Sequence, residues 1–331
     1  MMINLDMNEN RCIDPISLQY EDMDYCGYPR GLSSKLIKKI SNKYGINEET
    51  IILTNGIDEG IHLFCSYIKN NGWTLLVDTP NYVGVLDAID VIGVNVVFNK
   101  QTEKYDCQKT IACIESHDEI RAVYIANPRN PVGDYIEDVE LIISYCADKE
   151  ILVFLDEAYI EFCEGHVDVS IGFLSYNNLV IARTFSKAYG LASIRCGYVM
   201  VSDKKILREF KNIWSIQPYH MSQHSLMCAL LALDDDHRLF QSLERIQCQK
   251  EKLYRLLENT NVPYIRTQTN FVCFKNEDSL FESLMHAGIR VMPAEPFGFD
   301  GYFRITIAGE HEMQRLFEVI TDFFGGKNEA I

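Results

Sequence analysis

Six short runs of apolar, often β-branched residues recur between residues 74 and 201, and they restrict the possible folds more than any other feature of the sequence. They are TLLVD (74–78), VNVVF (94–98), RAVYIA (121–126), ILVFLD (151–156), NLVIAR (178–183) and CGYVMV (196–201). Strands that are apolar at nearly every position are buried on both faces, as in a mostly parallel sheet covered by helices. Helical patterns separate the runs, so the sequence predicts an α/β fold.

The pattern changes after about residue 236. A long charged helix is expected over HRLFQSLERIQCQKEKLYRLLEN, followed by the strand-like runs FVCFK and YFRITI and by helices that begin near residues 278 and 311. This order is typical of a smaller α+β domain. A chain of 331 residues, at roughly 150 residues per domain, is therefore expected to comprise an N-terminal arm (1–27), a large domain (28–235) and a small C-terminal domain (236–331).

Charge and cysteine content limit the partners and the compartment. The formal net charge of −16 argues against a nucleic-acid partner, because binding a phosphate backbone requires clustered Lys and Arg. The sequence has neither a signal peptide pattern nor a run of about 18 apolar residues, so no membrane partner is expected and the cytoplasm is the predicted location. The 11 cysteines form no C-x-x-C pair and are expected to be free thiols in a reducing compartment. His220 and His224 lack a third ligand, so no metal site is predicted.

Polar motifs follow several predicted strands or open the helices beside them. They are TNGIDEG (54–60), TPNY (79–82), NPRNPVG (127–133), DEAYIEF (156–162) and TFSK (184–187). In doubly wound sheets the ligand binds at the carboxyl ends of the strands. The sequence therefore predicts that these motifs meet in one site.

Lys187 lies in the stretch TFSKAYGLASIRCGY, where small residues surround it and Arg195 follows eight positions on. A lysine that bonds covalently to an aldehyde cofactor must spend time as a neutral amine. A crowded site and neighbouring cations favour that form because they lower the pKa of the lysine. Lys187 is therefore the predicted catalytic residue.

The other motifs supply the groups that the ring of pyridoxal 5′-phosphate requires. Asp156, at the end of a buried strand, can pair with the ring nitrogen and keep it protonated. Asn130 and Tyr159 can bond the phenolic oxygen, and Tyr82 can stack on the ring face. A structural role stays open for two of these residues: Asp156 could favour a helix N-terminus, and Tyr82 could be a core aromatic residue.

Candidates for binding the cofactor phosphate come from two of the motifs. A phosphate suits the backbone N–H groups at a helix N-terminus and the side chains of hydroxyl residues and arginine. The predicted phosphate ligands are the backbone of Ile57 and Asp58 and the side chains of Thr184, Ser186 and Arg195. Thr184 could also be an ordinary threonine at a strand end.

Taken together, NPRNPVG, DEAYIEF, TFSKAYGLASIRCGY and YFRITIAG resemble the class I/II aminotransferases of fold type I, most closely the histidinol-phosphate aminotransferase branch. The resemblance extends from LDMNEN to RITIAGEHEM. It implies a pyridoxal-phosphate-dependent transaminase with Lys187, Asp156 and Tyr82 at the catalytic centre. It also implies a homodimer with shared active sites, small-molecule amino donors and keto acceptors.

Three further residues receive roles only from this resemblance. Tyr28, in GYPRG, would reach the cofactor phosphate of the partner subunit. Arg304, in FRIT, would bind the carboxylate or phosphate of the substrate. Asn10, in MNEN, belongs to the arm that helps to close the site and is expected to contact the substrate.

The sequence departs from the branch where the substrate side chain would bind. The arm reads NENRCI in place of N-E-N-P, the segment between Asn10 and Tyr28 is short, and Met292 stands where the branch often has arginine. Histidinol phosphate with 2-oxoglutarate and glutamate is the foremost expectation. Another small phosphorylated or sugar-pathway substrate, a decarboxylase of the phosphothreonine type and a sensor that binds the cofactor without turnover stay open.

Overall fold

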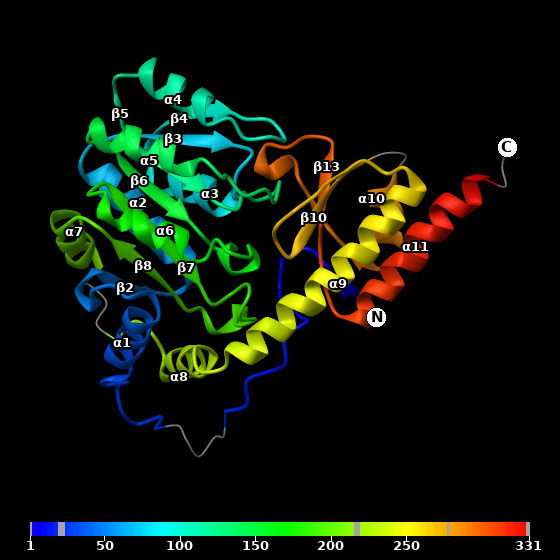
Figure 1. Ribbon diagram of the computed structural model, residues 1–331, viewed down its shortest axis with the longest axis horizontal. Coiled ribbons are helices and arrows are strands. Elements are labelled where there is room, and N and C mark those ends of the chain that lie inside the picture. Colours follow the sequence, from blue (N-terminus) through cyan, green and yellow to red (C-terminus); the bar gives the residue numbers. More distant parts are fainter. Residues whose placement is uncertain (1, 19–23, 215–218, 277–278, 329–331) are drawn as a thin grey trace.

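The computed structural model describes residues 2–18, 24–214, 219–276 and 279–328, and its largest element is a seven-stranded sheet (Figure 1). The strand order is β2-β8-β7-β6-β5-β3-β4. In this sheet β8 runs antiparallel to both of its neighbours, β2 and β7, and the other neighbouring strands pair in parallel. The predicted α/β fold with a mostly parallel sheet is confirmed. The strands are β2 (Ile51–Thr54), β3 (Thr74–Thr79), β4 (Asn95–Lys100), β5 (Ile120–Ala126), β6 (Leu152–Asp156), β7 (Leu179–Thr184) and β8 (Gly197–Val201).

Helices cover both faces of the sheet, because successive strand residues point to opposite faces and nearly all of them are apolar. In β6, Val153 and Leu155 belong to one core cluster while Leu152 and Phe154 belong to the other. The first cluster contains residues of α1 (Leu32–Tyr44), α4 (Cys107–Glu115), α5 (Val139–Asp148) and α8 (Gln223–Ala232); the second contains residues of α2 (Gly56–Asn70), α3 (Val83–Ile92) and α7 (Lys204–Trp214). The short helix α6 (Val169–Gly172) lies between β6 and β7 in the sequence.

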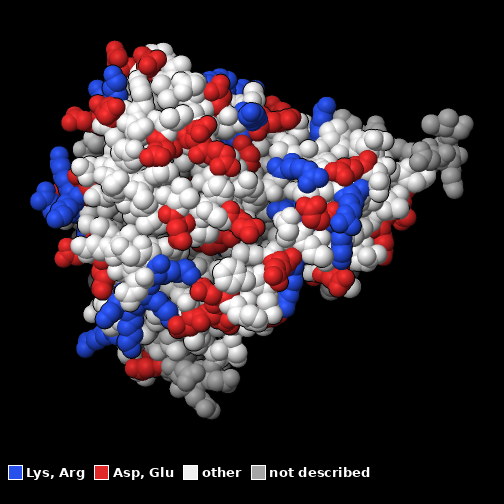
Figure 2. All heavy atoms as spheres, in the orientation of Figure 1, with Lys and Arg blue, Asp and Glu red and all other residues white. Residues whose placement is uncertain are grey.

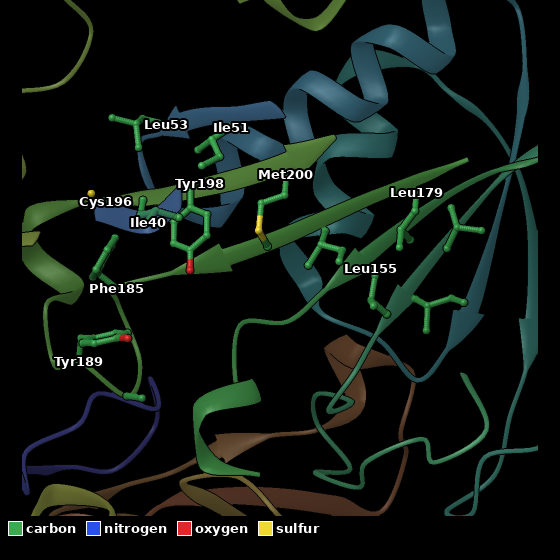
Figure 3. Close-up of a cluster of buried hydrophobic side chains, with 14 of the residues drawn as sticks. Ile40, Ile51, Leu53, Leu155, Leu179, Phe185, Tyr189, Cys196, Tyr198 and Met200 are labelled. Carbon is green, nitrogen blue, oxygen red and sulfur yellow. The ribbon is translucent and has the colours of Figure 1, made fainter. Parts of the chain in front are cut away.

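The first core cluster continues into the loop after β7 (Figure 3). Leu155, Leu179 and Met200 extend from β6, β7 and β8, and Phe185 and Tyr189 from the loop pack into the same cluster. Both aromatic side chains are buried, and their ring centroids are 5.1 Å apart. The backbone of residues 185–189 is therefore fixed by the core of the large sheet.

The C-terminal part of the chain forms the smaller α+β unit that the sequence predicts. The helix α9 (Asp236–Thr260) leads from the large sheet to it (Figure 1). An antiparallel sheet of order β12-β13-β10-β9 follows, and its strands pack with the helices on a third apolar cluster. The elements are β9 (Tyr264–Ile265), β10 (Phe271–Lys275), α10 (Leu280–His286), β11 (Ile289–Arg290), β12 (Met292–Pro293), β13 (Tyr302–Thr306) and α11 (Glu310–Asn328).

The first residues of the chain join this smaller unit. Strand β1 (Ile3–Asn4) pairs in parallel with β11, and the backbone N–H of Thr306 donates to the carbonyl oxygen of Leu5 at 2.8 Å. Residues 3–8 therefore run beside β13 toward the carboxyl ends of the strands in the large sheet. The division of the chain at residues 27 and 235 stays a prediction.

The charged side chains are mixed over the surface. On the face that Figure 2 shows, Asp and Glu are spread over the surface with Lys and Arg among them, and several basic side chains lie together at the lower left. None of the helices in the described part of the chain is long and apolar enough to cross a membrane.

Candidate active site

Lys187 lies in the loop that follows β7, between residues that are buried in the core. Phe185 and Ala188 are fully buried, and the backbone N–H of Gly190 donates to the carbonyl oxygen of Lys187 at 3.0 Å. The Lys187 Nζ lies 5.6 Å from the centroid of the Tyr159 ring and donates to the carbonyl oxygen of Met7 at 3.0 Å. A rigid backbone thus holds the amine in place, as a positioned catalytic lysine requires.

Asp156 ends β6, and its side chain is buried. Tyr124 of the neighbouring β5 donates its hydroxyl to Asp156 Oδ2, and the backbone N–H of Ala158 donates to Oδ1 at 3.0 Å. Burial raises the pKa of Asp156 to about 6, although both hydrogen bonds act to lower it. A cation beside this carboxylate would offset its desolvation, so Asp156 suits a protonated ring nitrogen.

A cavity opens beside these two residues, at the carboxyl ends of β5, β6 and β7. It contains about 340 Å³ of empty space, including the part at its open mouth. Five of the predicted residues therefore meet around one cavity, as the motifs at the strand ends predict. The lining residues are Tyr82, Ala126, Pro128, Asn130, Asp156, Ala158, Tyr159 and Lys187.

The predicted phosphate ligands form a second group of contacts, at the N-terminus of α2. Arg195 Nη2 donates to Asp58 Oδ2 at 2.7 Å, and Arg195 Nη1 lies 3.3 Å from Ser186 Oγ. Thr184 Oγ1 is 2.9 Å from Ser186 Oγ. Tyr82 donates its hydroxyl to Asp58 Oδ1 at 3.0 Å, and burial together with the Asp58 carboxylate raises the pKa of Tyr82. Asp58 thus contacts both Arg195, a predicted phosphate ligand, and Tyr82, which lines the cavity.

Gly56 allows the Arg195 guanidinium to lie directly against the N-terminus of α2. Its φ of +74° is in the left-handed region, and a Cβ built on it would lie 2.5 Å from Arg195 Nη2. A residue with a side chain would therefore displace the guanidinium. Gly56 is the first residue of α2, and the first N–H groups of a helix have no acceptor within the helix, so they suit an anion.

Arg304 projects from β13 and is buried beside the same cavity. Its Nη1 donates to Asn130 Oδ1, and its Nη2 donates to the carbonyl oxygen of Asp6 at 2.6 Å. The guanidinium carbon lies 5.2 Å from the centroid of the Phe271 ring and 5.1 Å from that of Phe297. Arg304 Nε is buried without a hydrogen-bond partner. Arg304 is thus a fixed cation that retains capacity to bind an anion.

Two residues at the site were not predicted. Asn8 donates from Nδ2 to the Tyr159 hydroxyl at 2.8 Å and is almost fully buried. Tyr124 is fully buried and donates to Asp156. The first asparagine of MNEN was a signal for Asn8. A single tyrosine hydroxyl within the apolar run RAVYIA was a signal for Tyr124, since a buried hydroxyl needs a partner.

Asn10 and Tyr28 lie apart from the cavity lining. Asn10 is buried, and its side chain binds the carbonyl oxygen of Ala188, Ser242 Oγ and the backbone N–H of Cys12. Tyr28 is 69% exposed, and its ring stacks on that of Tyr219 with the centroids 4.8 Å apart. Substrate contact by Asn10 and cofactor contact by Tyr28 stay predictions.

Pyridoxal phosphate fits this set of donors and acceptors. The cavity offers a lysine amine, a buried carboxylate without a cationic partner among the described residues, and the Tyr82 ring. The phosphate would bind at the N-terminus of α2, beside Arg195, Ser186 and Thr184. When bound, this cofactor supplies a ring that accepts electrons from the reacting carbon of an amino substrate.

The chain is similar to histidinol-phosphate aminotransferases in sequence and fold. It is 29% identical over 305 residues to the enzyme of that name from Geobacillus thermodenitrificans, with 89% of this chain and 81% of the relative covered. The structure of the histidinol-phosphate aminotransferase from Clostridium acetobutylicum superposes with a TM-score of 0.86 at 24% identity, covering 98% and 100% of the two chains. The Sinorhizobium meliloti enzyme in complex with pyridoxal-5′-phosphate superposes with a TM-score of 0.84 at 22% identity, covering 97% and 91%.

The family relationship agrees with the geometry of the site. The sequence model for aminotransferase class I and II matches residues 3–320, which include every residue described at the cavity. The chain therefore belongs to the class I and II aminotransferases, the pyridoxal-phosphate-dependent transaminases of fold type I.

Proposed function

We propose that the chain transfers an amino group between histidinol phosphate and 2-oxoglutarate, with glutamate as the other member of the pair. The observation that carries the proposal is Arg304, a buried arginine that Asn130 and Asp6 hold beside the cavity. In histidinol phosphate and in glutamate an anionic group lies close to the amine-bearing carbon. One guanidinium can therefore bind the phosphate of the first and the carboxylate of the second. Relatives at 28–30% identity carry this name.

Each residue of the site has a separate role in this reaction. Lys187 Nζ, as a free amine, would take up the proton from the substrate Cα. Asp156 would hold the ring nitrogen of the cofactor, and Tyr82 would contact the ring. Arg304 would hold the anion of the substrate and so fix which bond at Cα reacts.

Substrate assays on an Arg304→Gln variant test the proposal. Hydrogen bonds to a charged group contribute about 1.5–3 kcal/mol, so the KM for both histidinol phosphate and glutamate should rise by about ten- to a hundredfold. The visible absorbance of the bound cofactor should be unchanged. The exposed Arg315 provides a control, and Arg315→Gln should leave both KM values unchanged.

The same assays separate the alternatives. Turnover of another phosphorylated amine, with histidinol phosphate inert, would contradict the substrate assignment but not the transaminase. Release of carbon dioxide without amino transfer would indicate a decarboxylase. Cofactor absorbance that no amine alters would indicate a sensor.

A Gly56→Ala variant tests the phosphate site. The added Cβ should displace Arg195 and raise the dissociation constant for pyridoxal phosphate by about tenfold or more, because a charge-assisted contact is lost. Gly72→Ala is the matched control, since Gly72 also has a left-handed φ of +65° but no atom within 4 Å of its Cβ position. Both variants carry the backbone strain, and only Gly56→Ala should lose cofactor affinity. Equal affinities would contradict the assigned phosphate site.

We also propose that the chain works as a homodimer in the cytoplasm. The exposed Tyr28 and Tyr219 rings suit a contact with a second copy, through which Tyr28 would reach the phosphate bound to the partner. The 11 free cysteines suit a reducing compartment. A monomer at micromolar concentration in sedimentation would rule out this role for Tyr28.

A further inference from the structure

Lys250 is a buried cation that the proposed reaction does not use. It lies in α9 with 5% of its surface exposed, and its Nζ donates to the carbonyl oxygens of Thr267 and Thr269 at 3.1 and 3.2 Å. No carboxylate of the described residues forms an ion pair with it. Burial lowers the pKa of Lys250 to about 8. The ammonium is therefore still charged at neutral pH, and the two carbonyl groups replace its hydration.

The turn that Lys250 holds, residues 267–269, contacts the loop that carries Asn130. Thr267 Oγ1 and the backbone N–H of Gln268 both donate to the carbonyl oxygen of Gly133, at 3.0 and 2.8 Å. A Cβ on Gly133 would lie 2.2 Å from Thr267 Oγ1, so the two segments are as close as a glycine allows. This contact joins the small C-terminal unit to the NPRNPVG loop of the large sheet.

The residues directly after the turn contact the rest of the site. Asn270 Nδ2 donates to the carbonyl oxygen of Asn8 at 3.1 Å. The Phe271 ring packs edge-on against Tyr159, with the centroids 5.2 Å apart, and lies beneath the Arg304 guanidinium. A displacement of the turn would therefore move the Arg304 guanidinium relative to Asn130, although neither residue touches Lys250.

We propose that Lys250 is a positioning residue, which fixes the turn 267–269 against Gly133 and so sets the geometry of Arg304 and Asn130 for the substrate anion. This inference rests on the proposed function only in assigning the anion to Arg304. A neutral side chain of similar length would leave two buried carbonyl groups without a donor, and the turn would move to reach water. The loop that carries Asn130 would lose its support from the small unit.

Hydrogen exchange and glutamate affinity of the holoenzyme test this proposal in a Lys250→Met variant. The rate of hydrogen exchange of the amides in residues 127–134 and 267–271 should rise by about tenfold. The loss of one hydrogen bond from a charged donor changes an opening equilibrium by at least about tenfold. The dissociation constant for L-glutamate, from the change in cofactor absorbance without an acceptor, should rise by a similar factor. Lys250→Arg, which keeps the charge, should restore most of the affinity.

Gln249→Leu is the matched control, since Gln249 is the adjacent buried polar residue of α9 and has no hydrogen bond to the turn among the described contacts. It should leave both readouts unchanged. If Lys250→Met does not fold, Thr267→Val, which removes one donor to Gly133, should raise exchange in residues 127–134. Faster exchange in 267–271 alone, with unchanged glutamate affinity, would overturn the proposal. An error in the substrate assignment would leave the exchange result intact.

Discussion

Replacement of Lys187 by alanine is expected to lower the rate of amino transfer by about 10³-fold or more, since a positioned proton-transfer group contributes about 10²–10⁴-fold. The amine that reaches the cavity from the loop after β7 is the only lysine among its lining residues. The visible absorbance that arises when the cofactor bonds to a lysine should also be absent. Phe185 and Ala188 fix the backbone, so the variant should keep its fold.

Two further variants serve as controls for Lys187→Ala. Lys187→Arg keeps the positive charge but cannot bond to the cofactor aldehyde, so it should fail in both assays. Lys205→Ala, at an exposed position of α7, should behave as the unaltered protein. A Lys187→Ala protein that keeps the absorbance and the rate would show that another lysine is responsible.

Loss of the buried ion pair between Glu157 and Arg183 is expected to lower the free energy of unfolding by about 3–5 kcal/mol. Arg183 Nε donates to Glu157 Oε2 at 2.8 Å, and both side chains are fully buried. In a Glu157→Leu variant the guanidinium would stay charged without its counter-ion, because arginine does not release its proton. Urea unfolding measures the change.

The double variant Glu157→Leu/Arg183→Met separates the ion pair from packing. Apolar side chains of similar size often replace a buried ion pair at little cost, so the double variant should recover most of the stability. Glu157 follows Asp156, and Arg183 precedes Thr184. Glu157→Leu should therefore weaken cofactor binding as well. A loss below about 1 kcal/mol would show that Arg183 has another counter-ion.

The large sheet was predictable from the sequence because strands buried on both faces have a distinctive composition. All six predicted runs form strands, and α9 spans the long charged pattern. The strand β2, with four residues, is too short to show a period. The two-residue strands β1, β9, β11 and β12 exist through pairing with distant segments, so local sequence carries little information about them.

The site was predictable where the chain itself places residues at the carboxyl ends of strands. Lys187, Asp156, Asn130, Tyr82 and Tyr159 line one cavity; Asp156 ends a strand, and the other four lie shortly after one. Contacts across the chain were not predictable. Met7, which accepts a hydrogen bond from Lys187, is 180 positions away in the sequence. Lys250 cannot be told from the other charged residues of α9 in the sequence, because its burial depends on how this helix packs.

The most direct test of the central claim is a single-turnover reaction of the purified holoenzyme with histidinol phosphate and no acceptor. We expect one equivalent of the corresponding ketone, together with cofactor that stays bound to the protein in its aminated form. Addition of 2-oxoglutarate should then yield one equivalent of glutamate and restore the original absorbance. Cofactor that stays in its aldehyde form with histidinol phosphate and with L-glutamate alike would contradict an aminotransferase at this site.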